Sequence, residues 1–250
     1  MPLVSPAGGR GGFRAACCEV PTAQRIGHEA VVSTEIAAAW QACLEEAWAA
    51  YRAGSAPIGA AYADRSGNVV LRGRNRIGEE AAPSPFVYAS RVAHAEVNVL
   101  VQVPAGSHAE MATGALYTTL EPCPMCFGAA LMCGVREIRY GARDGWAGAA
   151  NLHSASPYVA SKGMRLLGPE PLVQAVSLVL LTEHVLRVES PRAEELVAAF
   201  TEEDEAAVGL GREWRGTGRL QRAARDGVAI DVLAREIWGR LMPAAMASEL

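Results

Sequence analysis

The stretch Leu116–Cys126 reads LYTTLEPCPMC and joins a predicted strand to a predicted helix. The apolar and β-branched run Ala115–Thr119 predicts a buried strand. The segment Cys123–Cys133 predicts a helix that Gly134 closes. This strand-to-helix step is a building unit of α/β sheets, and here it puts two cysteines at the start of the helix.

Further elements that alternate between helix and strand surround this unit. They are a helix from near Ser33 or Thr34 to Gly54, strands at Pro57–Ala63 and Val69–Gly73, a loop over Arg74–Ser90, a helix from His94 to Val101, a strand at Val135–Tyr140 and a loop over Gly141–Pro157. The alternation predicts an α/β fold of three layers, α/β/α, with helices on both faces of the sheet. Ligands usually bind in such sheets where loops gather at the strand ends.

The last third of the chain predicts mainly helix. Pro171–Arg187 suits either a helix or a strand followed by a helix, and Ser190-Pro191 is a typical helix start. The glycines in Gly209–Gly218 predict a break, after which Leu220–Leu241 is amphipathic. We therefore expect a flexible leader over residues 1–32, a core domain over 33–189 and a helical C-terminal extension over 190–250.

Composition and charge limit the class of protein. The chain has 250 residues, of which 50% are hydrophobic and 20% charged, and its formal net charge is −4. This charge gives no general attraction to phosphate backbones, which disfavours a nucleic-acid partner. The longest apolar run, Val173–Leu181, contains Gln174 and Ser177, and Met1–Arg25 has no apolar core typical of a secretory signal. We expect a cytoplasmic protein with no membrane association.

Three residues have the side chains and spacing of a zinc site. Six cysteines are too few for a disulfide scaffold, so the close pair Cys123 and Cys126 indicates metal binding or redox chemistry. Three residues apart on one helix, they share a face, and the helix start favours their thiolates. With His94 they provide three ligands and leave the fourth tetrahedral position open, as in catalytic zinc sites. A redox dithiol remains the alternative for the cysteine pair.

Glu96 follows His94 by two residues, which on a helix points the two side chains in different directions. We therefore interpret Glu96 as a residue that flanks the substrate, and not as a ligand. It would take a proton from water, pass it to a ring nitrogen and then help protonate the departing amine. His-x-Glu followed by Pro-Cys-x-x-Cys is the signature of zinc-dependent nucleobase deaminases.

The chain from about Trp40 to Leu152 resembles the cytidine and deoxycytidylate deaminase superfamily, and within it the branch of bacterial tRNA adenosine deaminases, guanine deaminases and fungal-type cytosine deaminases. The residues that carry the resemblance are Pro57-Ile58-Gly59, Asn75, His94-Ala95-Glu96, Leu116–Cys126, Gly141-Ala142-Arg143-Asp144 and Gly148-Ala149-Ala150. The resemblance implies a mixed five-stranded sheet, one Zn²⁺ per subunit and a homodimer.

The resemblance also suggests substrate contacts. Asn75 would hydrogen-bond the base or sugar, although a turn asparagine is an equal reading. Ala95 would present its backbone N–H to the substrate, and Asp144 would either contact the substrate amine or stabilise its own loop.

The expected substrate is a small nucleobase, nucleoside or related amino-heterocycle, from which ammonia is released. Where tRNA-editing relatives carry a basic, aromatic helix, this chain has the acidic run Phe200–Glu205, which would repel phosphates. Conversion of tRNA adenosine to inosine is the enzymatic alternative. A zinc-stabilised scaffold with a vestigial site is the non-enzymatic one.

Overall fold

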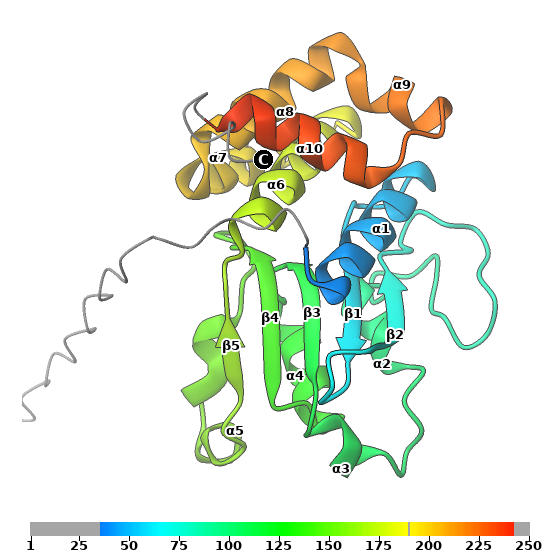
Figure 1. The fold of residues 1–250 in the computed structure, drawn as a ribbon. Coiled ribbons are helices and arrows are strands. Elements are labelled where there is room, and N and C mark those ends of the chain that lie inside the picture. Colours follow the sequence, from blue (N-terminus) through cyan, green and yellow to red (C-terminus); the bar gives the residue numbers. More distant parts are fainter. Residues whose placement is uncertain (1–35, 190, 243–250) are drawn as a thin grey trace, which may run out of the picture. The chain divides into compact units, whose positions relative to one another are not determined.

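A mixed five-stranded sheet is the centre of the fold (Figure 1). The computed structural model describes residues 36–189 and 191–242. The strands are β1 (Gly59–Ala63), β2 (Val69–Arg74), β3 (Ala115–Leu120), β4 (Glu137–Ala142) and β5 (Arg165–Leu167), in the order β2-β1-β3-β4-β5. The pairs β1/β2 and β1/β3 are antiparallel, whereas β3/β4 and β4/β5 are parallel. The expected mixed five-stranded sheet is confirmed.

Helices pack on both faces of this sheet, which confirms the three-layer α/β/α architecture. They are α1 (Ala38–Arg52), α2 (Ala95–Leu100), α3 (His108–Met111), α4 (Pro124–Met132), the 3-10 helix η1 (Ala150–Ser154), α5 (Pro157–Ser161), α6 (Pro171–Arg187), α7 (Ala193–Glu203), α8 (Glu205–Thr217), α9 (Arg219–Arg225) and α10 (Ile230–Leu241). Helices α1 and α6 pack against one face, and α2 and α4 cover the other.

Each face of the sheet has its own hydrophobic core. Along β3, Leu116 lies in the core beneath α2 and α4, while the next residue, Tyr117, packs toward α1. This alternation is what a strand buried on both faces requires. The Tyr117 ring meets Trp40 of α1 edge-on, with 5.0 Å between ring centroids. Sheet and helix layers are therefore joined by interlocking apolar side chains on both sides.

One predicted element boundary, the start of the first helix, lies elsewhere in the structure. Helix α1 begins at Ala38, and Ile36 and Ala37 before it are not helical, so the predicted start near Ser33 or Thr34 is too early. No side chain caps α1, and its position follows from burial of its apolar face. The predicted leader over residues 1–32 lies outside the described residues.

Four elements had no sequence signal, namely α3, η1, α5 and β5. Each is at most five residues long. Strand β5 alternates between exposed and half-buried positions, so it lacks the apolar run of the buried strands. Short, exposed elements depend on their neighbours for stability, and local sequence carries little information about them.

The glycine-rich segment was predicted incorrectly, because α8 continues through Gly209 to Thr217. At Gly211 an added Cβ would lie 2.7 Å from the Thr182 Cβ and 3.0 Å from the Val179 carbonyl oxygen of α6. This glycine therefore permits close packing of α6 against α8 and does not end a helix. The helix ends at Gly218, whose φ is +67°.

The C-terminal helices pack on α1 and α6. Helix α6 is continuous over Pro171–Arg187, which settles the alternative between helix and strand plus helix. The single amphipathic segment expected over Leu220–Leu241 is two helices, α9 and α10, with Gly227 between them at a φ of +69°. Trp48 Nε1 of α1 donates to the Val228 carbonyl at 2.8 Å, just before α10. The boundary between 189 and 190 stays a prediction.

None of the helices formed by residues 36–189 and 191–242 combines the length and apolar character that a bilayer span needs.

The contact between α6 and α8 can be tested with two glycines of the same helix. Gly211→Ala should lower the free energy of unfolding by about 1–3 kcal/mol, because the new methyl group overlaps α6. Gly209→Ala is the matched control, since an added Cβ there meets nothing within 4 Å. It should stabilise the protein by about 0.5–1 kcal/mol. Urea unfolding measures both, and equal stabilisation by both variants would contradict the close packing.

Candidate metal centre and cavity

Helix α2 lies directly on strand β2. A Cβ added at Gly73 of β2 would lie 2.7 Å from both the Ala95 carbonyl oxygen and the Val99 nitrogen. A side chain at this position would push the helix away from the sheet. The lack of a side chain at Gly73 therefore allows the first turn of α2 to lie directly against the end of β2.

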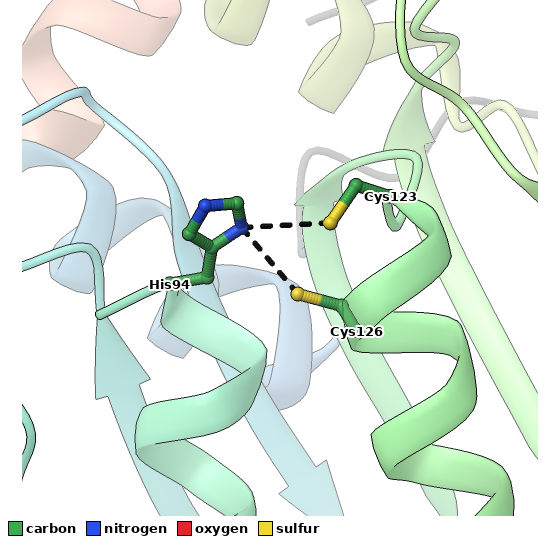
Figure 2. A group of neighbouring side chains, drawn as sticks. All are labelled: His94, Cys123 and Cys126. Carbon is green, nitrogen blue, oxygen red and sulfur yellow. Dashed lines mark hydrogen bonds between the residues drawn. The ribbon is translucent and has the colours of Figure 1, made fainter. Parts of the chain in front are cut away.

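The three expected ligands come from two helix N-termini (Figure 2). His94 is the residue before α2 and Cys123 the residue before α4, and both have extended backbone conformations. Pro124 occupies the first turn of α4, where its fixed φ suits the helix start. Cys126 lies in the same turn and is fully buried.

The distances between the donor atoms fit a tetrahedral zinc ion. His94 Nδ1 is 3.6 Å from Cys123 Sγ and 3.5 Å from Cys126 Sγ. With zinc bonds of about 2.3 Å to sulfur and about 2.0 Å to nitrogen, tetrahedral angles give a sulfur–nitrogen separation of about 3.5 Å. Among the described residues these three side chains form the group that can hold a metal ion, which leaves a fourth position open.

The cysteine pair is electrostatically prepared for a cation. Hydrogen bonding to Cys126, and also to His94, lowers the pKa of the Cys123 thiol to about 4. The contact with Cys123, together with burial, raises the pKa of the Cys126 thiol. The lowered pKa favours a thiolate at Cys123, and a metal ion bound by both sulfurs would displace the proton of the Cys126 thiol.

Glu96 is buried beside the ligand group. Its Oε1 accepts a hydrogen bond from Thr118 Oγ1 at 3.2 Å, and its Oε2 lies 3.4 Å from Cys126 Sγ, which donates to it. Burial raises the pKa of the Glu96 carboxyl. A raised pKa makes a carboxyl a better proton acceptor, as a general base requires.

A cavity of about 100 Å³ opens beside these side chains. It is lined by Ile58, Asn75, His94, Ala95, Glu96, Leu120, Glu121, Cys123, Asp144 and Ala147. A single water needs only about 10–15 Å³ of such space, so the cavity has room for a larger ligand. The three residues expected to contact substrate, Asn75, Ala95 and Asp144, all lie in its wall.

Asn75 satisfies a turn and still has a free donor. Its Oδ1 accepts from the Ile77 backbone N–H at 3.1 Å, as a turn asparagine does. Its backbone N–H donates to Ile58 at 2.9 Å. Its Nδ2 has no partner among residues 36–189 and 191–242. Asn75 therefore stabilises a turn, as one of the two interpretations expected. Its Nδ2 remains as a donor in a residue that lines the cavity.

Asp144 stabilises its own loop, as one of the two readings expected. Its Oδ1 accepts from the backbone N–H groups of Trp146 and Ala147, both at 3.0 Å. Burial raises the pKa of the Asp144 carboxyl. Its Oδ2 has no hydrogen-bond partner within the described part of the chain, so one oxygen remains available.

Glu121 is a site residue that the sequence reasoning missed. Its Oε1 accepts from the Ala150 N–H at 2.8 Å and its Oε2 from the Asp144 N–H at 3.3 Å. It thereby holds both ends of the loop that borders the cavity. The available signal was its place between a buried strand and the Pro-Cys pair, where a carboxylate would be costly to bury without partners.

Residues 33–142 match the family model described as the cytidine and deoxycytidylate deaminase zinc-binding region. Residues 33–142 belong to this family. The matched segment contains His94, Glu96, Cys123 and Cys126. It ends before Asp144, so the loop that borders the cavity lies just beyond it.

Curated relatives match less than half of this chain. The chain is 38% identical over 94 residues to a tRNA(Ile)-lysidine synthase of Deinococcus radiodurans, spanning 37% of this chain and 15% of that protein. It is 36% identical over 107 residues to a tRNA-specific adenosine deaminase of Agrobacterium fabrum, spanning 42% of this chain and 64% of that protein. The match thus spans less than two thirds of either relative.

Solved structures with similarity include a guanine deaminase from Nitrosomonas europaea, at 25% identity and a TM-score of 0.45, which covers 60% of this chain and 84% of that one. Another comes from work on A-to-I editing by tRNA:A34 deaminases, at 32% identity and a TM-score of 0.36, covering 45% of this chain and 80% of that one.

Elemental analysis tests the ligand set. The purified protein should contain one zinc per chain. Cys126→Ser should weaken zinc binding more than a change to a residue around the ligands does, which typically costs about 10–100-fold in affinity. Cys133→Ser is the control, because Cys133 follows the same helix at its other end. Metal-free protein in which Cys123 and Cys126 oxidise reversibly would instead support the redox dithiol.

Proposed function

We propose that this chain is a zinc-dependent hydrolytic deaminase of a small nucleobase, nucleoside or related amino-heterocycle. The reaction replaces the exocyclic amino group of a ring carbon by oxygen from water and releases ammonia. The observation that carries the proposal is Glu96, a buried carboxyl that contacts Cys126 and lines the same cavity as His94 and Cys123. A metal site with one open coordination position, a group that can transfer protons and a cavity therefore lie next to one another.

His94, Cys123 and Cys126 would hold the zinc, which when bound supplies Lewis acidity and makes water a nucleophile at neutral pH. Glu96 would take one proton from the attacking water and transfer it to a ring nitrogen. It would then carry the second proton of the same water from the added hydroxyl group to the amine, so that the oxygen stays on the ring carbon and the amine leaves as ammonia. Thr118 donates a hydrogen bond to Oε1 of the Glu96 carboxyl. This contact keeps Oε2 directed toward Cys126.

The free hydrogen-bonding groups of the cavity suit an amino-substituted ring. Asn75 Nδ2 can donate to a ring nitrogen or carbonyl, and Asp144 Oδ2 can accept from the amino group. Ala95 is the first residue of α2, so its N–H has no preceding helical turn to satisfy it. Two donors and one acceptor around a small cavity would orient the ring over Glu96.

The charge around the cavity favours an uncharged substrate. No lysine or arginine is among the residues that line it, whereas Glu96, Glu121 and Asp144 are. The acidic end of α7 lies beside the rim, since Glu203 Oε1 is 3.8 Å from where a Cβ would stand at Gly145. A phosphate entering here would meet carboxylates, which supports a free base or nucleoside over a nucleotide.

Deamination of tRNA adenosine is the second candidate. It is favoured by the relatives named as tRNA-specific adenosine deaminases, which include those of Bacillus subtilis and Haemophilus influenzae. A base flipped out of an anticodon loop would present the same ring to the cavity. The two candidates differ in the surface they need around the cavity entrance, where RNA requires cations.

A homodimer is proposed on family membership alone.

A substrate panel separates the two candidates. We expect ammonia release from at least one of guanine, adenine, cytosine and their nucleosides, and weaker release from the matching 5′-monophosphates. A tRNA anticodon stem-loop, read as conversion of adenosine to inosine, forms the second arm. Activity confined to the stem-loop would overturn the small-molecule proposal and establish the tRNA candidate.

Substitution of Glu96 tests the mechanism. Glu96→Gln should lower the rate of ammonia release by at least about 100-fold, because the amide cannot carry the proton. Zinc content and thermal unfolding should stay at wild-type values. Glu80→Gln, in the exposed loop, is the control and should leave activity unchanged. Normal turnover by the Glu96 variant would refute the assigned role, and no turnover by any form would favour the scaffold.

A further inference from the structure

A fully buried asparagine, Asn98, lies one helical turn beyond the expected ligand His94. The two residues are joined by the helix itself, since the Asn98 N–H donates to the His94 carbonyl at 3.0 Å. The Asn98 side chain has no exposed surface. An amide is costly to bury unless it is hydrogen-bonded, so its partners show what it does.

The Asn98 amide makes three hydrogen bonds, all to backbone groups. Its Oδ1 accepts from the Val87 N–H at 2.8 Å. Its Nδ2 donates to the Val87 carbonyl at 3.0 Å and to the Arg74 carbonyl at 3.0 Å. The side chain thus pairs with Val87 as the peptide group of a neighbouring strand would, and simultaneously holds the end of β2.

These bonds join α2 to the end of β2 and to the long loop that follows it. Arg74 is the last residue of β2 and directly precedes Asn75, whereas Val87 lies in the middle of the loop over residues 75–94. The loop has no helix or strand of its own. Loops of this length inside a compact domain are usually functional, and they need specific contacts to hold one conformation.

Other contacts stiffen the loop internally. Glu79 accepts from the guanidinium groups of both Arg74 and Arg76. The Arg76 N–H donates to the Ala93 carbonyl, and the Ala89 N–H donates to the Arg76 carbonyl. The loop is therefore cross-linked by its own hydrogen bonds, and the Asn98 amide attaches it to α2.

We propose that Asn98 is a positioning residue, which fixes the Asn75 amide relative to the metal ligands. Asn98 is connected to both groups over a short distance in the chain. It shares one helical turn with His94, and its Nδ2 donates to the carbonyl of Arg74, the residue before Asn75. A displacement of about 1 Å between a binding group and the reacting centre can cost about 100-fold in rate. The kinetic consequence rests on the function proposed above, whereas the attachment itself does not.

Only an amide satisfies this arrangement. A leucine of similar size would leave the Val87 N–H and two carbonyl groups buried without partners. An aspartate has the same shape, but it would bring an oxygen against the carbonyl oxygens of Arg74 and Val87. Asn98→Asp therefore breaks two of the three bonds with little change in volume.

Hydrogen exchange measured by mass spectrometry tests the attachment on the full-length, zinc-containing protein. In Asn98→Asp, amides of the segment around Val87 should exchange at least about tenfold faster, with zinc content and exchange in α1 unchanged. Gln102→Ala is the matched control. Its Nε2 donates to Arg72 of β2 at 2.8 Å and to the Asn98 carbonyl, not to the loop.

Asn98→Ser covers the case in which the aspartate variant does not fold. It removes the amide without placing a charge against the carbonyl groups, and it should accelerate exchange around Val87 in the same direction. Wild-type exchange in a folded variant would overturn the attachment.

Kinetics test the link to Asn75. With whichever compound of the base and nucleoside panel is turned over, the Asn98 variants should raise KM by about tenfold or more while kcat changes less, because Asn75 binds substrate and transition state alike. Gln102→Ala should leave both unchanged. Faster exchange with an unaltered KM would overturn the positioning role. If no panel compound reacts, the proposed function has failed, and the exchange experiment still decides the attachment.

Discussion

The structure depends on two helix N-termini meeting at one point. Helices α2 and α4 lie against each other on one face of the sheet, and His94 and Cys123 immediately precede their first residues. Two positive helix ends so close together repel each other unless negative charge lies between them. The Cys123 thiolate, which the lowered pKa of this residue favours, supplies that charge. The residues suited to hold a cation thus also make the packing of the two helices favourable.

The polar groups around the cavity fall into two kinds. Glu121 and Asn98 have their side-chain hydrogen bonds filled by backbone groups, and they fix the two loops that border the site. Asn75 and Asp144 each use one oxygen for their own loop and keep one atom without a partner among the described residues. The first kind gives the cavity its shape. The second kind is available to a ligand.

Sequence predicted the parts of the fold with strong local patterns. The strand before Cys123 follows from its apolar, β-branched run, and the expected metal-binding residues follow from their types and spacing. Gly211 was misread because a glycine that admits a neighbouring helix looks like one that ends a helix. Glu121 and Asn98 could not be predicted, since their partners are backbone groups of loops whose course only the fold determines. The structural roles of these two residues follow from their burial in the fold and not from their residue types.

The hydrogen bond from Trp48 to Val228 has a consequence for how this protein can be shortened. Helices α7–α10 cover the same apolar cluster as α1 and α6, in which Trp214, Leu233 and Ile237 are buried. A chain cut after α6 would retain every side chain of the metal group, yet it would leave the outer surface of α1 and α6 open to water. Such a fragment would be prone to aggregate, so a minimal soluble version must replace this apolar surface rather than simply delete its cover.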